Sequence, residues 1–371
     1  MAEWKEYTLG ELLQYEQPTA YIVKSTDYND NYKTPVLTAG KTFILGYTNE
    51  RQGVYDELPV IIFDDFTTAS QYVNFKFKVK SSAMKILKAN AGLVLPKFVF
   101  YRMQIIKFDA STHKRYWIQH YSKIKVKIPP TISEQEHIIS RIEELFSQLD
   151  VSVNELKTAK ERLKVYRQAV LKEAFGEVTT HTPFGEIIDA RLGKMLDKEK
   201  NTGDFHKYLR NINVRWFSFD LSNLLEMRIE ADEIEKYSVS HNDLIICEGG
   251  EPGRCAVWDK QDSIFYQKAL HRVRFLDNSN PRFYMYYLWF SAQSGQLCRY
   301  FTGTGIKHLT GQSLSRVIVP TADRTIQDSI VAEIESRLSV CDSIENTVDT
   351  ALQQAEALRQ SILKKAFEGG L

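Results

Sequence analysis

Three short segments carry residue types that could take part in catalysis, and each lacks something that its chemistry needs. The sequence Asn-Pro-Arg-Phe at residues 280–283 departs from the Asn-Pro-Pro-aromatic motif of amino-methyltransferases, because an arginine replaces the second proline. The glycine-rich residues 249–254 follow an expected strand at 244–247 but lack the Lys-Ser/Thr ending of a phosphate-binding loop. Asp64 and Asp65 have no Glu and Lys at a nuclease-like spacing. We therefore expect no catalytic site.

The cysteines and the apolar runs exclude further classes of protein. Cys247, Cys255, Cys298 and Cys341 lack the C-x-x-C spacing that holds zinc, and they are too few for a disulfide scaffold. We expect reduced thiols and no metal site. The first residues lack the apolar core of a signal peptide, and no apolar run approaches the length of a membrane span. The chain is therefore expected to be cytoplasmic, without membrane contact.

Positive charge is concentrated in one part of the sequence. The net charge of the 371 residues is only +1, yet residues 71–127 contain 13 Lys and Arg against the single acid Asp109. Aromatic residues are interleaved with these cations, which is typical of proteins that bind a nucleic-acid backbone. A strand with one solvated face is the alternative, because residues 75–80 alternate Phe or Val with Lys. DNA binding is the favoured interpretation.

Polar residues near the ends of expected strands are the candidate DNA contacts. Arg and Gln can pair bidentately with guanine and adenine, and Asp can accept a hydrogen bond from cytosine. In the first half of the chain the candidates are Asp65, Thr67, Thr68, Gln71, Lys76, Lys114, Arg115 and Tyr116. In the second half they are Arg254, Tyr266, Gln267, Lys268, His271, Thr304, Lys307 and His308.

One loop is expected to contact DNA in both halves. When Pro129 is aligned with Pro320, residues 115–117 occupy the place of residues 306–308, which belong to a glycine-containing loop at 302–309. Such a loop lets the backbone approach phosphates closely.

The elements that position these residues repeat along the chain. Residues 133–175 recur at 326–367 with an offset of 192, and residues 167–175 and 359–367 are identical at six of nine positions. Apolar residues in each copy recur at steps of three, four or seven, so each copy is predicted to be one long helix. About forty residues at about 1.5 Å each give a rod of roughly 60 Å, which a small domain cannot cover.

A long apolar stripe is buried best against a similar stripe, so we expect the two helices to pair with each other in antiparallel orientation. The alternative is a coiled coil that dimerises the chain with itself. The predicted seam consists of Ile138, Ile142, Leu145, Leu149, Leu156, Leu163, Ile330, Ile334, Cys341, Val348, Leu352 and Ile362.

A mixed α/β domain is expected before each helix. Residues 60–63 and 104–108 are predicted strands of the first domain. Residues 9–13 match 184–188 near the domain starts, and residues 124–129 match 315–320 near the ends. The chain is thus predicted to be an α+β protein with an internal pseudo-two-fold repeat. We place its domains at 1–130 and 179–320, and its long spacer helices at 131–178 and 321–371.

The order of these features resembles the DNA-specificity (S) subunit of a type I restriction-modification system. The resemblance covers the whole chain. It rests on the opening at residues 4–13, the strand ending in Ile-Pro-Pro at 128–130 and the helix start at 133–139. It rests also on the second-half equivalents of the last two at 319–320 and 326–330.

The resemblance implies a non-catalytic function in DNA recognition. Each of two target-recognition domains would read one half of a bipartite site in double-stranded DNA. The helices would set the spacer and dock two modification subunits, with restriction/translocase subunits in the full complex. No cofactor is expected in this chain, and S-adenosylmethionine for adenine methylation would be bound by the partner modification subunit. The alternative function is a non-enzymatic, two-lobed adaptor that binds protein partners.

Overall fold

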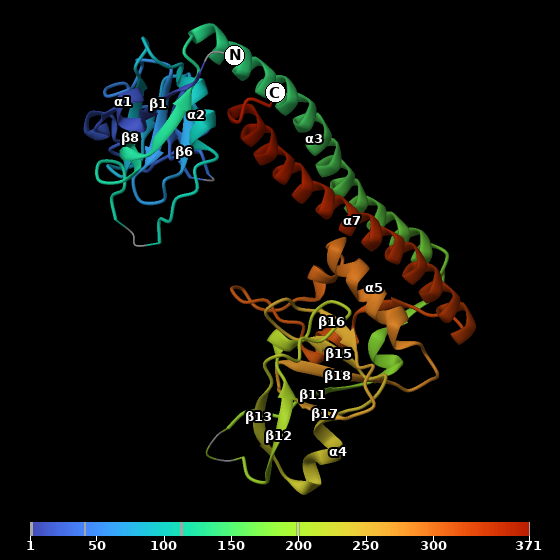
Figure 1. The fold of residues 1–371 in the computed structure, drawn as a ribbon. Helices are drawn as coiled ribbons and strands as arrows, with labels where there is room; N and C mark the ends of the chain where they lie inside the picture. Colours follow the sequence, from blue (N-terminus) through green and yellow to red (C-terminus); the bar gives the residue numbers. More distant parts are fainter. Residues whose placement is uncertain (1–2, 41, 112–113, 198, 200, 371) are drawn as a thin grey trace. The chain divides into compact units, whose positions relative to one another are not determined.

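A computed structural model describes residues 3–40, 42–111, 114–197, 199 and 201–370. The chain divides into two compact units (Figure 1). The first unit consists of Met1–Leu156 with Thr350–Leu371, and the second unit consists of Lys157–Asp349. Each long helix therefore contributes one part to each unit. Within the described ranges, every helix is either too short or too polar to cross a membrane.

The described residues of the first unit form two sheets, a two-stranded ribbon and the short α-helices α1 and α2, in addition to parts of the long helices. A four-stranded antiparallel sheet has the order β2-β8-β5-β6, and a three-stranded sheet has the order β4-β3-β7, with β3 and β7 parallel. β1 pairs with β9. The bounds are β1 Lys5–Thr8, α1 Leu9–Leu12, β2 Leu13–Glu16, η1 Pro18–Tyr21, β3 Thr34–Leu37, β4 Ile44–Thr48, β5 Val60–Asp64, β6 Ser70–Val73, β7 Lys78–Val79, β8 Met84–Ala89, α2 Pro96–Met103, η2 Tyr121–Lys123 and β9 Lys125–Ile128.

The second unit repeats this arrangement. Its antiparallel sheet has the order β11-β18-β15-β16, its other sheet has the order β13-β12-β17-β14, and β10 pairs with β19. The bounds are β10 His181–Pro183, η3 Phe184–Glu186, β11 Ile188–Leu192, β12 Asp204–Leu209, η4 Asn211–Asn213, β13 Leu225–Ile229, η5 Ala231–Glu233, α4 Ile234–Tyr237, β14 Ser238–Val239, β15 Leu244–Cys247, β16 Cys255–Val257, β17 Ile264–Tyr266, β18 Leu270–Phe275, α5 Pro281–Gln293, η6 Leu297–Tyr300, α6 Gly311–Ser315 and β19 Ile318–Pro320.

The central sheet of each unit is buried on both faces. In β5, Ile61 and Phe63 face the core that includes α2 and the long helices, whereas Val60 and Ile62 face the second sheet. Alternate residues of β15 are divided between two cores in the same way. A strand that is buried on both faces reads as a continuous apolar run, which is why these strands were predictable. The predicted α+β class and the internal repeat are confirmed.

One predicted strand is wrong. Residues 104–108 follow α2 as a turn, because Gln104 caps the helix by donating its backbone N–H to the carbonyls of Phe100 and Tyr101. Pro96 at the first turn starts this helix, as its fixed φ favours. The apolar residues Ile105, Ile106 and Phe108 pack against the core from an irregular segment. A short apolar run alone cannot distinguish these structures.

The long helices are α3, Ile132–Gly176, and α7, Arg324–Phe367, and they lie side by side in Figure 1. In the second unit, Lys160 pairs with Asp349 at 2.7 Å, and Arg167 pairs with Glu345 at 2.7 Å. Arg337 pairs with Glu173 at 2.9 Å. Rising numbers in α3 thus meet falling numbers in α7, so the helices are antiparallel and the chain pairs its own copies.

The predicted seam residues lie in the interior to different degrees. Six are buried, namely Ile142, Leu163, Ile334, Cys341, Val348 and Ile362. The other six are half-buried, namely Ile138, Leu145, Leu149, Leu156, Ile330 and Leu352. Ile138 and Ile142 pack into the core of the first unit, and Ile330 and Ile334 into that of the second. The first turns of both long helices therefore pack into the domain cores. The sequence had predicted that these residues pack between the two helices.

Two buried glutamines, 192 residues apart, tie α2 in the first unit and α5 in the second unit to the start of a long helix. Gln135 accepts a hydrogen bond from the Leu95 N–H at 2.9 Å and donates to the Leu93 carbonyl at 3.0 Å. Gln327 accepts from the Asn280 N–H at 2.6 Å and donates to the Ala322 carbonyl at 2.8 Å. Both side chains satisfy backbone groups beside the start of α2 or α5.

Further contacts repeat with the same spacing. Glu143 pairs with Lys97 at 2.7 Å, and Glu335 pairs with Arg282 at 2.8 Å. The rings of Phe98 and Phe367 have centroids 5.2 Å apart, and those of Phe283 and Phe175 are 5.3 Å apart. Glu143 and Glu335, like Phe175 and Phe367, are separated by the repeat offset of 192. The repeat is therefore preserved in individual contacts.

We predict that Gln135→Leu destabilises the first unit by about 2 kcal/mol, because it leaves the Leu95 N–H and the Leu93 carbonyl buried without partners. Thermal denaturation should show a first transition lower by roughly 4–8 °C. Gln148→Leu, at an exposed position of the same helix, is the matched control and should change little. Equal Tm values for the two variants would contradict the assigned function of Gln135.

Candidate nucleic-acid interface

In the first unit, two loops far apart in sequence meet at the end of β5. The turn at residues 64–69 and the loop at 114–117 form this first junction. Asp65 joins them: its carbonyl accepts the Tyr116 N–H at 2.9 Å, and its carboxylate accepts the Trp117 N–H at 2.8 Å. Asp64 shapes the turn by accepting the N–H groups of Phe66 and Thr67.

A buried lysine contacts the first junction from the interior of the unit. Lys85 lies 3.5 Å from the Asp65 carboxylate and donates to the side-chain oxygen of Gln17 at 2.9 Å. Lys85 and Asp65 are each only 1% exposed. A buried charge needs an opposite partner and hydrogen bonds, and this pair provides both. Asp65 was predicted to read a base, but the structure assigns it to holding the loop.

The outer surface of the first junction carries cations. Lys114, Arg115 and Thr67 are exposed, and the Arg115 guanidinium lies 5.9 Å from the ring centroid of Phe66. Tyr116, a predicted DNA contact, is buried against Phe108, with ring centroids 5.1 Å apart, so in this structure it anchors the loop.

The second unit builds the corresponding second junction from the turn at residues 247–254 and the loop at 302–309. The Leu309 N–H donates to the Glu248 carbonyl at 2.7 Å. Thr302 and His308 exchange two backbone hydrogen bonds, of 2.8 and 2.9 Å. Thr304 and Lys307 are exposed on this loop, and the Lys307 ammonium donates to the Gly303 carbonyl at 2.8 Å.

His271 was predicted to contact DNA but lies beneath the second junction. It is 1% exposed, and its Nε2 donates to the Leu309 carbonyl at 2.8 Å. Burial lowers the pKa of His271, which keeps the ring neutral. Like Lys85 in the first unit, His271 supports the loop from inside.

Matching hydrogen bonds align the two junctions residue by residue. The Asp65 N–H donates to the Ala83 carbonyl at 2.9 Å, and the Glu248 N–H donates to the Ala269 carbonyl at 3.0 Å. Tyr116 therefore corresponds to Leu309, and the pair Lys114–Arg115 corresponds to Lys307–His308. The proline-based alignment, which matched 115–117 with 306–308, was two residues out of register. The loops after these residues differ in length.

The Arg254 guanidinium makes hydrogen bonds within the second unit. Its guanidinium donates to the Glu251 carboxylate at 2.8 Å and to the Asn211 carbonyl at 3.0 Å. The Asn211 side chain donates to the Gly249 carbonyl at 2.5 Å, and the Trp216 indole donates to Glu251 at 2.7 Å. Sequence patterns missed Asn211, Trp216 and Glu251, because no local signal marks residues that meet only in the folded unit.

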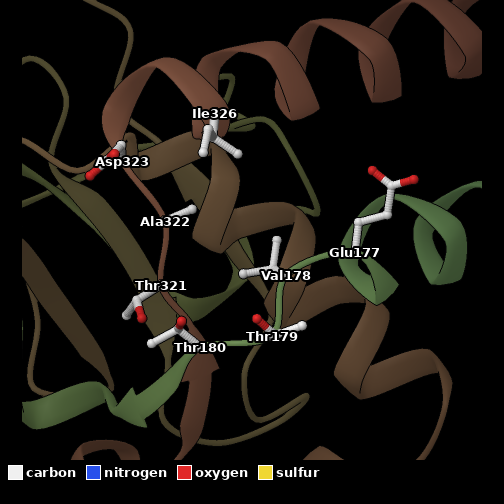
Figure 2. A pocket seen from close by; sticks show the side chains of 8 residues that line it. All are labelled: Glu177, Val178, Thr179, Thr180, Thr321, Ala322, Asp323 and Ile326. Carbon is white, nitrogen blue, oxygen red and sulfur yellow. The ribbon is translucent and has the colours of Figure 1, made fainter.

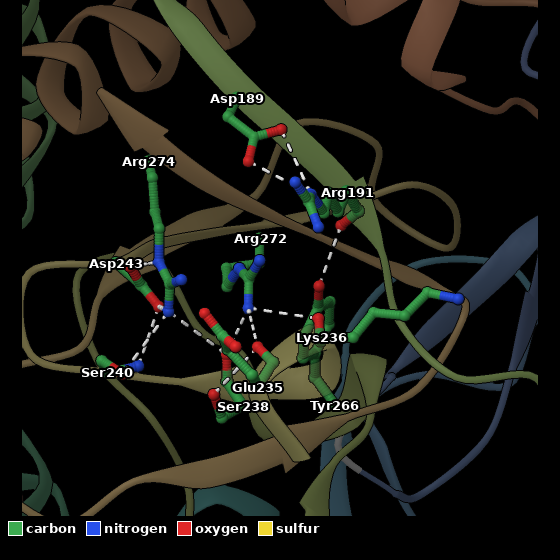
Figure 3. A network of polar contacts seen from close by, with 10 residues as sticks. All are labelled: Asp189, Arg191, Glu235, Lys236, Ser238, Ser240, Asp243, Tyr266, Arg272 and Arg274. Atoms are coloured by element: carbon green, nitrogen blue, oxygen red, sulfur yellow. Dashed lines mark hydrogen bonds and ion pairs between the residues drawn. The ribbon is translucent and has the colours of Figure 1, made fainter. Parts of the chain in front are cut away.

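Tyr266, another predicted DNA contact, is fully buried. Its hydroxyl donates to the Arg191 carbonyl at 3.2 Å, and burial raises the pKa of Tyr266 to about 12. Of its neighbours in sequence, Gln267 is half-buried and Lys268 is exposed. Figure 3 shows the polar network around this tyrosine.

The arginines of β18 in this network hold the fold. The buried Arg272 donates to the carbonyls of Lys236 at 3.2 Å and Ser238 at 2.6 Å, beside the end of α4 (Figure 3). Arg274 pairs with Asp243 at 2.7 Å. Cations near a helix C-terminus satisfy its free carbonyls.

Acids from other parts of the fold neutralise several of the cations at residues 71–127. Lys78 is buried and pairs with Glu50 at 3.1 Å, so it forms neither a DNA-facing surface nor a solvated strand face. Acids pair with Lys76, Lys88, Lys97 and Lys125 as well. Gln71 and Thr68 are half-buried. Six cations of this run are exposed and make no ion pair with another described residue, namely Lys80, Lys107, Lys114, Arg115, Lys123 and Lys127.

A pocket in the second unit lies away from these loops. It is lined by residues 177–180 after α3, residues 321–323 before α7, and Ile326 (Figure 2). Its acids, Glu177 and Asp323, lie on opposite sides and do not converge (Figure 2). The pocket therefore offers no acid–base pair.

Known proteins are similar to this chain in sequence and in fold. The family model for the type I restriction modification DNA specificity domain matches residues 1–161 and 183–354. The EcoR124I/EcoR124II specificity subunit of Escherichia coli is 46% identical over 58% of this chain and 54% of its own length. The StySPI specificity subunit of Salmonella potsdam is 25% identical over 77% of this chain and 66% of its own length. The chain thus spans less than two thirds of either relative.

Two solved structures share the fold. A chain from a type I R-M system, solved to explain complex assembly and conformational transition, has a TM-score of 0.76 at 16% identity, over 99% of this chain and 98% of that chain. The HsdS subunit from Thermoanaerobacter tengcongensis has a TM-score of 0.54 at 16% identity, over 99% and 97%. Because the family model matches both repeats, this chain belongs to the type I restriction modification DNA specificity family.

Proposed function

We propose that this chain is the DNA-specificity subunit of a type I restriction-modification complex. Its target-recognition domains, residues 1–130 and 179–320, would each read one half of a bipartite site in double-stranded DNA. The spacer helices, residues 131–178 and 321–371, would set the distance between the half-sites. The observation that carries this proposal is the duplicated junction, in which the same hydrogen bonds present Lys114–Arg115 in one unit and Lys307–His308 in the other.

The chemistry of the junctions suits this function. Exposed cations on loops can neutralise phosphates, and the neighbouring polar turns can approach base edges. No paired catalytic groups emerge from the geometry described above. We propose that the chain is non-catalytic and binds no cofactor. Two modification subunits would bind S-adenosylmethionine and methylate adenine, and restriction/translocase subunits would complete the assembly. Because DNA would be the ligand of this chain, we place the protein in the cytoplasm.

A two-lobed adaptor that binds only protein partners is the other candidate. Both functions need two units and long helices, but only the DNA-reading function requires binding to a split sequence that weakens steeply with salt. Methylome sequencing of cells that carry the complex would identify the split sequence, and titration of a duplex with that sequence would then test binding. Salt-independent binding that ignores sequence would favour the adaptor.

We predict that Lys307→Ala weakens binding of the complex to all DNA sequences and reduces the slope of log K against log salt by about 1, because it removes one phosphate contact. Fluorescence anisotropy over a salt series measures both quantities. Lys260→Ala, at an exposed position outside the junctions, is the control. If the two variants had equal slopes, the second junction would not face DNA.

The purified chain alone is expected to bind no S-adenosylmethionine and to transfer no methyl group to DNA, since that chemistry would reside in the modification subunits. Calorimetry of the chain with S-adenosylmethionine is the measurement, and the assembled complex is the positive control. Stoichiometric binding by the chain alone would refute the non-catalytic assignment.

The spacer function predicts a change in the recognised sequence. Inserting four residues near Lys157 and four near Asp349 lengthens both helices by about 6 Å but turns them by about 400°, which is about 40° from the original phase. One extra base pair rotates a half-site by roughly 36°, and two rotate it by about 72°. We therefore expect a spacer longer by one base pair, with unchanged half-sites.

Sequencing of methylated adenines in cells carrying the lengthened variant measures this spacer. A four-residue insertion after Lys260, in an exposed loop, should leave the spacer unchanged. Retained methylation with the original spacer in the lengthened variant would show that the helices do not set the distance.

A further inference from the structure

Thr68 has a backbone conformation that its residue type disfavours. Its φ is +60°, in the left-handed region, where β-branched side chains are rarely found. Phe217 and Asn242 are the other non-glycine residues with positive φ in the described part of the chain. Asn tolerates this region, and Phe217 packs on Trp289 with ring centroids 4.8 Å apart. Thr68 therefore needs its own explanation.

The turn itself does not require a threonine. The Thr68 N–H donates to the Asp64 carbonyl at 2.9 Å, and the Asp64 N–H donates to the Ala69 carbonyl at 2.8 Å. The second unit repeats both bonds, from Gly253 to Cys247 at 2.9 Å and from Cys247 to Arg254 at 2.8 Å. Gly253, which corresponds to Thr68, closes the turn without a side chain. A Cβ there would lie 2.3 Å from Leu297 Cδ2, so the Leu297 side chain would have to move to admit one.

The turn around Thr68 is held at both ends. Before it, Asp64 and Asp65 fix the backbone and the loop at 114–117. After it, Ser70 begins β6, and its hydroxyl accepts a hydrogen bond from the Gln104 amide at 2.9 Å. Thr68 is thereby kept in a strained conformation, and strain that the surroundings maintain is most often found at functional sites.

The hydroxyl of Thr68 is the group that remains for a ligand. The neighbouring Thr67 hydroxyl accepts the Ala69 N–H at 3.4 Å. Thr68 is half-buried, and its hydroxyl makes no hydrogen bond to another described residue. The turn also carries Phe66, on which the Arg115 guanidinium rests at 5.9 Å. Thr68 thus belongs to the same turn as Phe66, the ring that the exposed Arg115 approaches.

We propose that Thr68 is a specificity-determining residue of the first unit and that its hydroxyl forms a hydrogen bond with a base edge in the major groove. This inference rests on the proposed function, because it requires that the first junction face DNA. The hydrogen bonds of Asp64, Asp65 and Ser70 hold this turn rigidly. A threonine hydroxyl can either donate to or accept from a base. The strain is retained because a relaxed glycine turn would lose this contact.

The test uses the full chain assembled with its modification subunits and duplexes that carry the bipartite site found by methylome sequencing. Each base pair of both half-sites is substituted in turn, and affinities are measured for the wild type, Thr68→Val, Thr68→Gly and Thr68→Ser. Valine preserves the branched shape without the hydroxyl, glycine removes strain and side chain together, and serine preserves the hydroxyl. Gly253→Ala is the matched change in the second unit.

We expect Thr68→Val and Thr68→Gly to lose about tenfold discrimination at one base pair of one half-site, while Thr68→Ser retains it. The Tm of Thr68→Gly should not fall below that of the wild type, because glycine adopts this φ freely. Gly253→Ala, which strains the second unit, should leave discrimination at the half-site that Thr68 affects unchanged. Unchanged discrimination in both Thr68→Val and Thr68→Gly would overturn the assignment. A wild-type complex without a split site would instead refute the proposed function.

Discussion

The structure depends on the burial of the apolar stripe that α3 and α7 each present. A 45-residue and a 44-residue helix cannot bury such a stripe alone, and the chain solves this by placing its two copies against each other in antiparallel orientation. Ion pairs such as Lys160–Asp349 and Arg167–Glu345 flank the apolar residues in the second unit. These pairs are only partly buried, and such pairs add little stability, so the apolar contacts make the larger contribution.

The same helices also complete the core of each unit. Phe175 and Phe367, at equivalent places of the repeat, insert beside Phe283 and Phe98. Gln135 and Gln327 satisfy the backbone beside α2 and α5. A mutation in these contacts would therefore affect both the helix pair and the domain on which it packs. The contacts between domain and long helix are alike in the two repeats, whereas the interiors of the two domains differ.

The junctions show how two divergent domains can present one kind of surface. Lys85 with Asp65 in the first unit and His271 in the second are chemically different, yet each is a buried polar group that ties a distant loop to the central sheet. Buried groups whose hydrogen bonds are all satisfied make the surrounding structure rigid. The residues at the equivalent outer positions, the exposed Arg115 and the half-buried His308, differ in type between the two units.

The periodicity of the sequence by itself determined the long helices, the apolar strands at 60–63 and 244–247, and the repeat, because these features depend on local patterns of apolar residues. Tertiary structure alone decided which polar residues are available to a ligand. Four residues are of types that commonly contact DNA but are buried, namely Asp65, Tyr116, Tyr266 and His271. Two lysines, Lys78 and Lys85, form ion pairs inside the first unit. Asn211 and Glu251 join one network only because loops 38 residues apart meet, as the hydrogen bond from Asn211 to Gly249 shows. Burial and pairing are properties of the whole fold, since the partner of a charge is set by long-range packing and not by its neighbours in sequence.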